Sequence, residues 1–475
     1  MHVLFPTGRQ SEEALKSSLA KVTKFTYEIV VTGEIASFLT PTQLEKLISC
    51  GNYDCVVVSG MCTASFEEID NTADVKIFRG TRHASDMSLC EPLIISGSLS
   101  KTKPADELLT EEKKKNALEK LVQSETEADF DFEIRGVKFG KSSRIKVVCE
   151  IMDAHTCPNL REKAIAAFDS GADAVDLGFG FDACEADVIR CFEELEDLPF
   201  PLSVDTLNPD LIRAALFRAD IVFSLTKKTI SVLADAVKKS GAVCVLISRD
   251  GNSLEETVAL AKAHGLTKIL ADPLLLPPLS KMTESLAGYT KDYGISKVLG
   301  CVNVIELTDA DSVGMCALLA SVASETDCSA VLISEHSDKT SGACFEMRRA
   351  TEIMALSKGR PYPKDAGIDL FVIKEKRKRH EPSLVYDEIR DAPLPRENLV
   401  YDKKGSFRIG IENGYVVAVR HGKAIRGKTW YEVFSAILEE EGVSLLDHAG
   451  YLGKELYKAE LALRFGRSFE QDGEF

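Results

Sequence analysis

The feature that most constrains the fold is a regular succession of short apolar runs through the middle of the chain. Between residues 145 and 358 these runs recur about every 25 to 30 residues, and each is followed by a polar turn and a stretch with helical spacing. The runs cover residues 145–152, 172–177, 202–205, 221–225, 243–248, 269–272, 298–303 and 330–334. Eight strand–helix units close a parallel (β/α)8 barrel, and an open, doubly wound sheet is the competing arrangement. We therefore predict a TIM barrel over residues 131–362.

The residues before the barrel also alternate between strand and helix patterns. Strands are expected at 2–6, 27–32 and 55–59, and helices at 11–21 and 41–50. This alternation indicates a small α/β domain of Rossmann or flavodoxin-like type over residues 1–100. Its first strand ends in Thr7-Gly8-Arg9, a loop that could hold an anion at a helix start, although one glycine in such a turn is common. Residues 101–130 are predicted to form a helical connector.

Two hairpins are expected on either side of the barrel repeats. Residues 132–140 alternate around Gly136, and this hairpin could close the lower end of the barrel. Near the other end of the chain, residues 407–411 and 415–420 alternate on either side of Asn413-Gly414, a pair that favours a tight hairpin turn. Helices are expected at 429–440 and 446–465. Residues 370–475 are thus predicted to form a small α+β domain.

Composition narrows the classes of partner. The net charge of −16 argues against nucleic-acid binding, and the basic run 374–380 is interpreted as a solvated linker. The 13 cysteines are scattered and form no Cys-x-x-Cys pair, which is typical of the reducing cytoplasm. We find no secretion signal and no apolar run long enough to cross a bilayer. A cytoplasmic protein without a membrane partner is expected.

The ends of the predicted barrel strands carry many hydrogen-bond acceptors. In a (β/α)8 barrel, function lies at the carboxyl ends of the strands. The polar residues at these ends are Glu150, Asp153 and His155 after the first strand, then Asp176, Asp205, Ser224, Asp272, Asn303 and His336. A mouth rich in carboxylates suits a ligand rich in N–H donors, such as the pyrimidine edge of a pterin. A divalent metal is the rival ligand, but no short metal-ligand spacing is present, so no metal is predicted. For any one aspartate, helix capping is the alternative role.

Three motifs resemble the pterin-binding barrel superfamily, which includes dihydropteroate synthases and methyltetrahydrofolate:corrinoid methyltransferases. They are Gly171-Ala-Asp-Ala-Val-Asp176-Leu-Gly178, Leu202-Ser-Val-Asp205-Thr206 and Ala271-Asp272-Pro273-Leu-Leu-Leu-Pro277, at the second, third and sixth strands. The resemblance covers residues 130–360. The whole chain is also similar to archaeal dihydropteroate synthase-related proteins, which have flanking domains of this kind.

Other positions depart from the dihydropteroate synthase pattern. After strand one the chain reads Met152-Asp153-Ala-His155 instead of Asn-x-Thr-x-Asp-Ser. Strand seven ends in Asn303-Val304 instead of Ser-Arg-Lys, and strand eight in Ser334-Glu335-His336 instead of Arg-x-His. The cations that would hold a diphosphate and an aminobenzoate are therefore missing. Without them, the charge that develops as diphosphate leaves would not be compensated.

The methyltransferase pattern is closer at two positions. Residues 272–277 match Asp-Pro-Leu-x-x-Pro, and Asn303-Val304 resembles the pair that hydrogen-bonds near the pterin N5. The resemblance implies that Asp272 anchors the pyrimidine ring, that Asp205 makes a second pterin contact, and that Asn303 is the catalytic group at N5. Asp176 and Ser224 would complete the pterin site, although Ser224 stands where both groups of enzymes have Asn. Further candidates are Glu150, Asp153, His155 and His336.

These observations lead to one functional hypothesis with two alternatives. We expect a barrel that binds a reduced pterin, of tetrahydrofolate or tetrahydromethanopterin type, for methyl or one-carbon transfer. A transferase of dihydropteroate synthase type in folate or methanopterin biosynthesis is the first alternative, and a non-catalytic pterin-binding protein is the second. A corrinoid supplied by a partner protein is the expected methyl acceptor. A homodimer is also expected.

Overall fold

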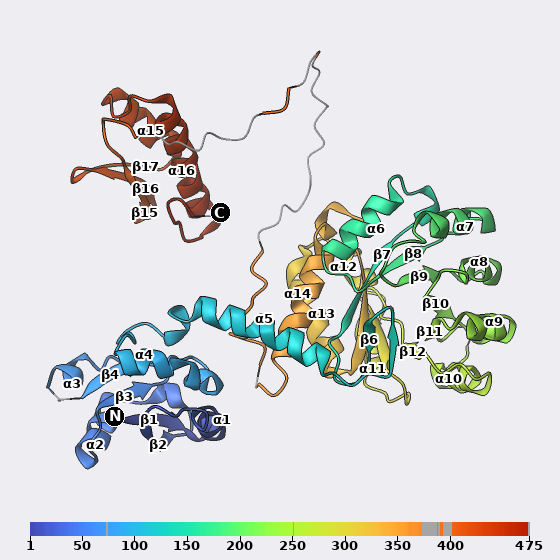
Figure 1. Ribbon diagram of the computed structural model, residues 1–475, viewed down its shortest axis with the longest axis horizontal. Coiled ribbons are helices and arrows are strands. Elements are labelled where there is room, and N and C mark those ends of the chain that lie inside the picture. The colour runs from blue at the N-terminus through green and yellow to red at the C-terminus, as the bar shows by residue number, and fades with distance from the viewer. Residues whose placement is uncertain are drawn as a thin grey trace. The chain divides into compact units, whose positions relative to one another are not determined.

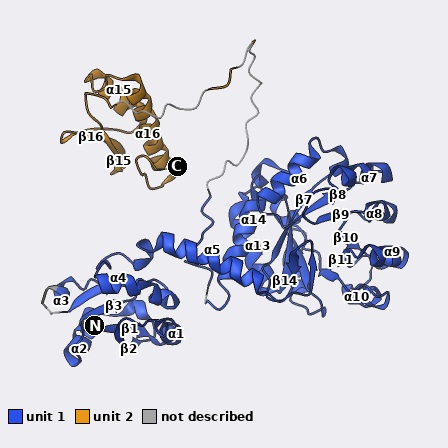
Figure 2. Cartoon of the chain, in the orientation of Figure 1, with its two compact units in different colours: residues 1–380 blue, residues 381–475 orange. Residues whose placement is uncertain are grey.

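The computed structural model describes residues 1–72, 75–249, 251–360, 362–372, 387, 390–392 and 401–473 (Figure 1). The chain divides into two compact units, Met1–His380 and Glu381–Phe475 (Figure 2). Each unit is described by itself. The basic run 374–380 lies outside the described residues.

A closed parallel barrel forms the centre of the first unit. Its strands are β7 (Lys146–Ile151), β8 (Ala174–Gly178), β9 (Leu202–Asp205), β10 (Ile221–Leu225), β11 (Val243–Ile247), β12 (Ile269–Asp272), β13 (Lys297–Gly300) and β14 (Cys328–Ser334). Each strand pairs with the next in the sequence, and β14 pairs with β7 to close the ring. The predicted (β/α)8 barrel is confirmed, and the open-sheet alternative is excluded.

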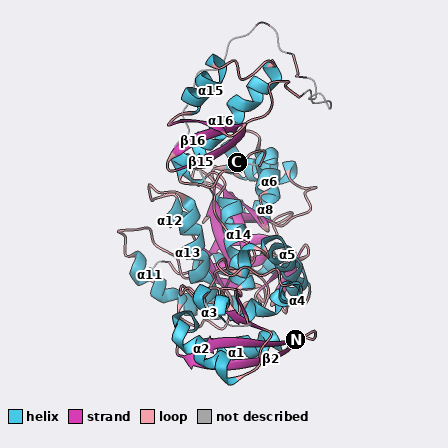
Figure 3. Cartoon of the chain, turned by 90° about the vertical axis from the view of Figure 1, so that its left-hand side faces the viewer, coloured by secondary structure: helices cyan, strands magenta, loops and turns pink. Residues whose placement is uncertain are grey.

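Helices surround the barrel, as Figure 3 shows in cyan around the magenta strands. They are α6 (Leu160–Asp169), α7 (Glu185–Glu194), α8 (Pro209–Ala215), α9 (Lys227–Ser240), α10 (Leu254–Ala263), α11 (Met282–Tyr289), α12 (Val302–Ile305), α13 (Ser312–Glu325) and α14 (Ala343–Leu356). The helix α9 illustrates how the sequence sets their limits. The Thr226 hydroxyl caps its first turn, Gly241 ends it in the left-handed conformation, and Ile230 and Leu233 bury its inner face.

A short hairpin fills the lower end of the barrel, as the sequence predicts. Strands β5 (Phe132–Ile134) and β6 (Val137–Phe139) are joined by Arg135 and Gly136, both at positive φ. Phe132 and Phe139 pack in the same buried cluster as the inward-facing residues of the barrel strands. The Arg135 guanidinium pairs with Asp220, which directly precedes β10, at 2.9 Å. The hairpin therefore lies at the amino ends of the strands and leaves the opposite end open.

The N-terminal part of the first unit is a four-stranded parallel sheet in the order β2-β1-β3-β4. Its strands are β1 (His2–Gly8), β2 (Thr26–Gly33), β3 (Cys55–Val58) and β4 (Lys76–Arg79), and its helices are α1 (Glu12–Leu19), α2 (Pro41–Cys50), α3 (Glu67–Thr72) and α4 (Glu91–Ser96). Separate apolar clusters, one containing Phe5 and the other Leu4, lie on the two faces of the sheet. The sequence analysis found three of these strands and missed β4.

A 17-residue helix, α5 (Thr110–Thr126), connects this sheet to the barrel. Its Glu125 accepts a hydrogen bond of 2.7 Å from Lys146, at the start of β7. Burial lowers the pKa of Lys146 to about 8, and the nearby charge of Arg144 adds to the effect. The predicted connector is thus attached to the lower end of the barrel by an ion pair between the buried Lys146 and the partly exposed Glu125.

The second unit is a three-stranded antiparallel sheet with two helices. Its elements are β15 (Arg408–Glu412), β16 (Tyr415–Arg420), β17 (Lys423–Gly427), α15 (Trp430–Glu439) and α16 (Leu446–Phe465). The predicted hairpin is confirmed, with Asn413 and Gly414 at positive φ, and β17 was not predicted. The apolar face of α16, which includes Leu452 and Leu456, packs with Val416 in the core of this unit. No helix of the described residues is long and apolar enough to span a membrane.

We predict that Leu456→Ala destabilises the second unit by about 2–5 kcal/mol, because the truncation leaves a cavity in a fully buried core. Trp430, the single tryptophan of the chain, lies in α15 and reports on this unit alone. Its fluorescence during denaturation should show that the variant unfolds with a midpoint at a lower urea concentration than the unaltered protein. Leu446→Ala, at a side chain that is 92% exposed, is the control and should leave the midpoint unchanged.

Candidate functional site

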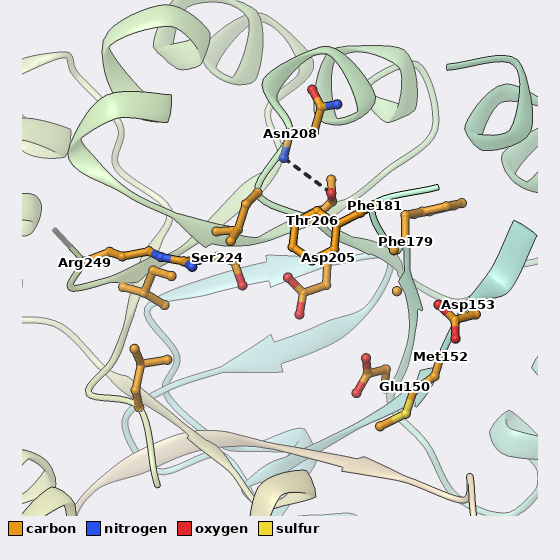
Figure 4. Close-up of a pocket in the computed structure, with 15 residues that line it drawn as sticks. Glu150, Met152, Asp153, Phe179, Phe181, Asp205, Thr206, Asn208, Ser224 and Arg249 are labelled. Carbon is orange, nitrogen blue, oxygen red and sulfur yellow. Dashed lines mark hydrogen bonds between the residues drawn. The ribbon is translucent and has the colours of Figure 1, made fainter. Parts of the chain in front are cut away.

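The open end of the barrel holds a cavity of about 750 Å³ (Figure 4). Its walls are the carboxyl ends of β7 to β12 and the loops that follow them. The lining residues are Glu150, Met152, Asp153, Gly178, Phe179, Gly180, Phe181, Asp205, Thr206, Leu207, Asn208, Ser224, Ile247, Arg249 and Leu274. The cavity thus contains the predicted candidates Glu150, Asp153, Asp205 and Ser224.

Three carboxylates meet where β7, β8 and β9 end. In the barrel register Glu150 pairs with Asp176, and Asp205 lies one strand further along, beside Gly178. Each of the three offers one oxygen, and these oxygens all lie within 4.8 Å of one another. Figure 4 shows the carboxylates of Glu150 and Asp205 directed into the cavity. We call these three residues the carboxylate trio.

Burial makes full ionisation of the trio unfavourable. It raises the pKa of Glu150 to about 7, and the negative charges of Asp205 and Glu306 add to the rise. Burial also raises the pKa of Asp176, which is fully inaccessible, well above its usual value. The pKa of Asp205 is raised for the same reason, although a hydrogen bond from Ser224 opposes this shift. Near neutral pH the trio therefore retains protons and can donate hydrogen bonds as well as accept them.

Asp176 lies deepest in the trio. Its Oδ1 accepts a hydrogen bond from Ser203, whereas its buried Oδ2 has no hydrogen-bond partner among the described residues. Such an atom is costly unless a proton, a ligand or a cation satisfies it. Carboxylate oxygens are also the ligands that hard divalent cations prefer, and the trio is the group of described residues that could hold one.

Asp272 is fixed in one orientation at the end of β12. Its Oδ1 accepts a hydrogen bond of 2.8 Å from the Leu274 backbone and one of 3.0 Å from the Tyr289 hydroxyl. Burial raises the pKa of Asp272 to about 6, and these two hydrogen bonds limit the rise. No hydrogen bond to its Oδ2 from a described residue is present, and Asp272 itself lies at the strand end without lining the cavity of about 750 Å³. Oδ2 can therefore accept a hydrogen bond from a ligand.

Asn303 lies outside the strand in which the sequence analysis placed it. The strand β13 ends at Gly300, and Asn303 belongs to the short helix α12. Its Nδ2 donates a hydrogen bond of 3.1 Å to the carbonyl of Leu275, in the loop after β12. The prediction of a strand to residue 303 was wrong because the chain turns into a helix directly after the barrel rim. The predicted role of Asn303 at a pterin N5 stays a prediction.

The two candidate histidines lie at the edge of the mouth. His155 follows β7, and its Nε2 lies 3.3 Å from Asp182 Oδ2. The backbone N–H of His336 donates to Glu306, and the residue lines a separate cavity of about 240 Å³ beside Glu150. Asp153, at positive φ, is directed into the main cavity.

Several residues at the site were not singled out from the sequence. Glu306 accepts hydrogen bonds from Ser334, Ser337, Thr340 and the backbone of His336, and although burial opposes it, these bonds hold the pKa of Glu306 below its usual value. Tyr289 supports Asp272 from α11. Phe179 and Phe181 supply aromatic surface, and Arg249 supplies a cation on the side of the cavity away from Asp153 (Figure 4). The Gly-Phe-Gly-Phe sequence after β8 was the one visible signal for the two phenylalanines.

A curated relative matches the chain almost from end to end. The chain is 31% identical over 517 aligned positions to the "Uncharacterized protein MJ0107" of Methanocaldococcus jannaschii, and the match covers 99% of this chain and 98% of that protein. The chain belongs to the same family. Residues 401–472 match the family model PterinBD-DUF4346. This match agrees with the resemblance to pterin-binding proteins found in the sequence.

Other similarities are local or distant. A Ycf91-like protein of Nostoc sp. is 37% identical over 83 residues, which cover 15% of this chain and 64% of that protein. Among solved structures, the dihydropteroate synthase of Yersinia pestis is 17% identical with a TM-score of 0.40 and covers 48% of this chain and 99% of its own. Mycobacterium tuberculosis Rv1207 is 18% identical with a TM-score of 0.38, over 49% of this chain and 100% of its own.

The raised pKa of Glu150 predicts a pH-dependent effect on stability. The folded protein holds this proton up to about pH 7, whereas an ordinary glutamate releases it near 4.5, so the native state loses stability as pH rises through this window. Glu150→Gln cannot ionise and should increase the free energy of unfolding at pH 8 by roughly 1–3 kcal/mol, with little change at pH 4. Urea denaturation followed by circular dichroism measures both values. Glu133→Gln, on the exposed side of the lower hairpin, is the control.

Proposed function

We propose that the barrel mouth binds the ring system of a reduced pterin. The observation that carries the proposal is the pair of carboxylates at the ends of β9 and β12, the partly buried Asp205 and the buried Asp272. Asp272 has one oxygen fixed by the protein, and its other oxygen accepts no hydrogen bond from a described residue. Such a group can accept the 2-amino and ring N–H of a pyrimidine edge, which would replace hydrogen bonds that the buried carboxylate lacks.

The cavity supports a flat, partly apolar ligand. Phe179, Ile247 and Leu274 line it, and its volume of about 750 Å³ lies within the range of small-molecule sites. Polar groups at its edge and apolar surface on its walls are the combination that a fused heterocycle needs. Ser224 stays a proposed pterin contact, because it lines the cavity and hydrogen-bonds to Asp205.

A reaction at N5 of the pterin would use the protons that the carboxylate trio retains. A methyl group leaves a tertiary amine slowly unless that nitrogen gains a proton or a strong hydrogen bond. Glu150, with a pKa of about 7, is matched to deliver and recover a proton near neutral pH. Asn303 is the second proposed contact to N5. These features favour transfer of a methyl or one-carbon group over a non-catalytic binding role.

We also propose the type of pterin, the methyl acceptor, the cellular location and the oligomeric state. The pterin would be of tetrahydrofolate or tetrahydromethanopterin type, and a corrinoid on a partner protein would accept the methyl group. The protein would act in the cytoplasm as a homodimer. A dihydropteroate synthase-type reaction is disfavoured, because Arg249 is the single cationic residue among the described residues that line the cavity.

We predict that Asp272→Asn weakens the binding of tetrahydrofolate by roughly 1.5–3 kcal/mol, the usual contribution of a hydrogen bond to a charged group. The asparagine keeps an oxygen for the Leu274 N–H and the Tyr289 hydroxyl, so the local fold should persist. Isothermal titration calorimetry measures the affinity. An unchanged affinity would remove Asp272 from the site.

A matched control for this substitution is Asp210→Asn. Asp210 lies on α8, is mostly exposed and pairs with Arg213 on the same helix. It should bind tetrahydrofolate like the unaltered protein. Asp205→Asn should weaken binding alongside Asp272→Asn, because the two carboxylates are proposed to hold the same ligand.

We also predict that the protein does not condense a pterin diphosphate with 4-aminobenzoate. Arg249 is the single cation among the described residues that line the mouth, so most of the charge that develops on a departing diphosphate would be uncompensated. A coupled assay for released diphosphate tests this. Sustained turnover that Arg249→Ala abolishes would restore the synthase-type reaction and refute the methyl-transfer proposal.

A further inference from the structure

A second cavity, of about 400 Å³, lies at the carboxyl edge of the N-terminal sheet, outside the barrel. The strand order β2-β1-β3-β4 places β1 and β3 side by side, and the connections from these two central strands proceed in opposite directions across the sheet. The loops after β1 and β3 therefore separate at this edge. In open parallel sheets, such a switch in direction creates the crevice in which ligands bind.

The polar residues that line this cavity are mainly hydrogen-bond donors, whereas those of the barrel mouth are mainly acceptors. The polar residues of this second cavity are Thr7, Gln10, Ser11, Ser37, Ser59, Thr81, Arg82, His83, Ser85 and Arg360. No aspartate or glutamate is among the described residues that line it, although the chain as a whole carries a net charge of −16. Hydroxyl, amide and guanidinium groups favour an anionic ligand and would not attract the proton-donating edge of a pterin.

Several of these polar groups lack a partner within the protein. The side chains of Thr7, Gln10, Ser11 and Ser37 line the cavity and make no hydrogen bond with any described residue. Ser11 occupies the N-cap position of α1, yet its hydroxyl does not cap the helix. The Glu12 N–H donates to the Arg9 carbonyl, so the Ser11 hydroxyl is the group that remains available at this helix start, beside the loop that leaves β1.

A segment that follows the last barrel helix contributes a cation to the cavity. Arg360 donates to the Asp86 carboxylate through Nη1 at 3.2 Å and Nη2 at 3.3 Å. Its Nε is buried and has no hydrogen-bond partner among the described residues. Its Nη2 also donates to the carbonyls of Lys364 at 3.4 Å and Asp365 at 3.3 Å, so the protein holds this guanidinium in place beside the cavity.

The same segment also covers part of the cavity with an aromatic ring. Tyr362 lies against His83, with ring centroids 5.1 Å apart, and Asp365 approaches His83 Nε2 to 3.3 Å. Burial lowers the pKa of His83, and the charge of Arg360 adds to this effect. His83 is therefore neutral near pH 7 and can serve as a polar contact without carrying charge.

We propose that this cavity binds a phosphorylated small molecule of about mononucleotide size. The phosphate would lie at the start of α1, where it would accept hydrogen bonds from the hydroxyls of Thr7, Ser11 and Ser37. The rest of the ligand would pack on Met61 and Tyr362. This site is separate from the proposed pterin site, and its ligand has the opposite hydrogen-bonding character.

The first turn of α1 also carries Glu12 and Glu13, whose charges oppose an anion. Neither of them lines the cavity, and Lys16 pairs with both, at 2.7 and 3.1 Å. Their unfavourable contribution is therefore partly compensated before a ligand arrives.

Calorimetric titration of the full chain with AMP, and with adenosine as its matched control, tests the proposal. We expect saturable binding of AMP and at least about ten-fold weaker binding of adenosine, which lacks the phosphate. Ser11→Ala should reduce the affinity for AMP about five-fold or more without changing the thermal unfolding midpoint, because the hydroxyl makes no contact within the protein. Ser49→Ala, on the exposed side of α2, is the control and should bind AMP normally.

Arg360→Gln provides a second variant. It should weaken AMP binding as well, and a loss of its Asp86 contact would be visible as a lower unfolding midpoint. Asp272→Asn, which alters the barrel mouth, should bind AMP like the unaltered protein. This result would show that AMP binds in the N-terminal cavity and not in the barrel mouth. The proposal is overturned if AMP does not bind, if adenosine binds equally well, or if Asp272→Asn abolishes AMP binding while Ser11→Ala does not.

Discussion

The hydrogen-bond ladder that closes β14 onto β7 is the constraint on which the candidate site depends. A closed parallel barrel has no free edge, and it brings the carboxyl ends of all eight strands to one rim. Glu150 and Asp205, which are distant in the sequence, thereby share one cavity. The hairpin β5–β6 fills the other end through Phe132 and Phe139. A ligand can therefore enter the barrel from the rim alone.

The same closure forces carboxylates together at a cost to stability. Asp176 is buried, Glu150 and Asp205 are partly buried, and each has a pKa above its usual value. A fold selected for stability alone would not retain three such groups, because apolar residues would avoid both the desolvation and the repulsion. Groups with shifted pKa values gathered in a cleft are typical of functional sites. The cost is understandable if a ligand rich in N–H donors, or a cation, neutralises them.

Two cavities of opposite character then exist in one compact unit. The barrel mouth presents the acceptors Asp205 and Asp272, whereas the N-terminal cavity presents the donors Ser11 and Arg360. The segment after α14 leaves the barrel and contacts the N-terminal sheet through Arg360 and Asp86. A ligand in the N-terminal cavity would therefore touch a part of the chain that is continuous with the last barrel helix.

The sequence by itself determined the barrel and both hairpins, because apolar periodicity and Asn-Gly or Gly turns are local signals, and it named Glu150, Asp153, Asp205 and Ser224 among the residues that line the cavity. It missed β4 and β17, which are short strands, and it extended β13 to Asn303, since a strand and a short buried helix have the same apolar pattern. Only the tertiary structure decided which carboxylates lie close enough to raise one another's pKa, that Tyr289 orients Asp272, and that the Ser11 hydroxyl does not cap α1. These properties depend on distances between residues far apart in the chain, and no local pattern encodes them.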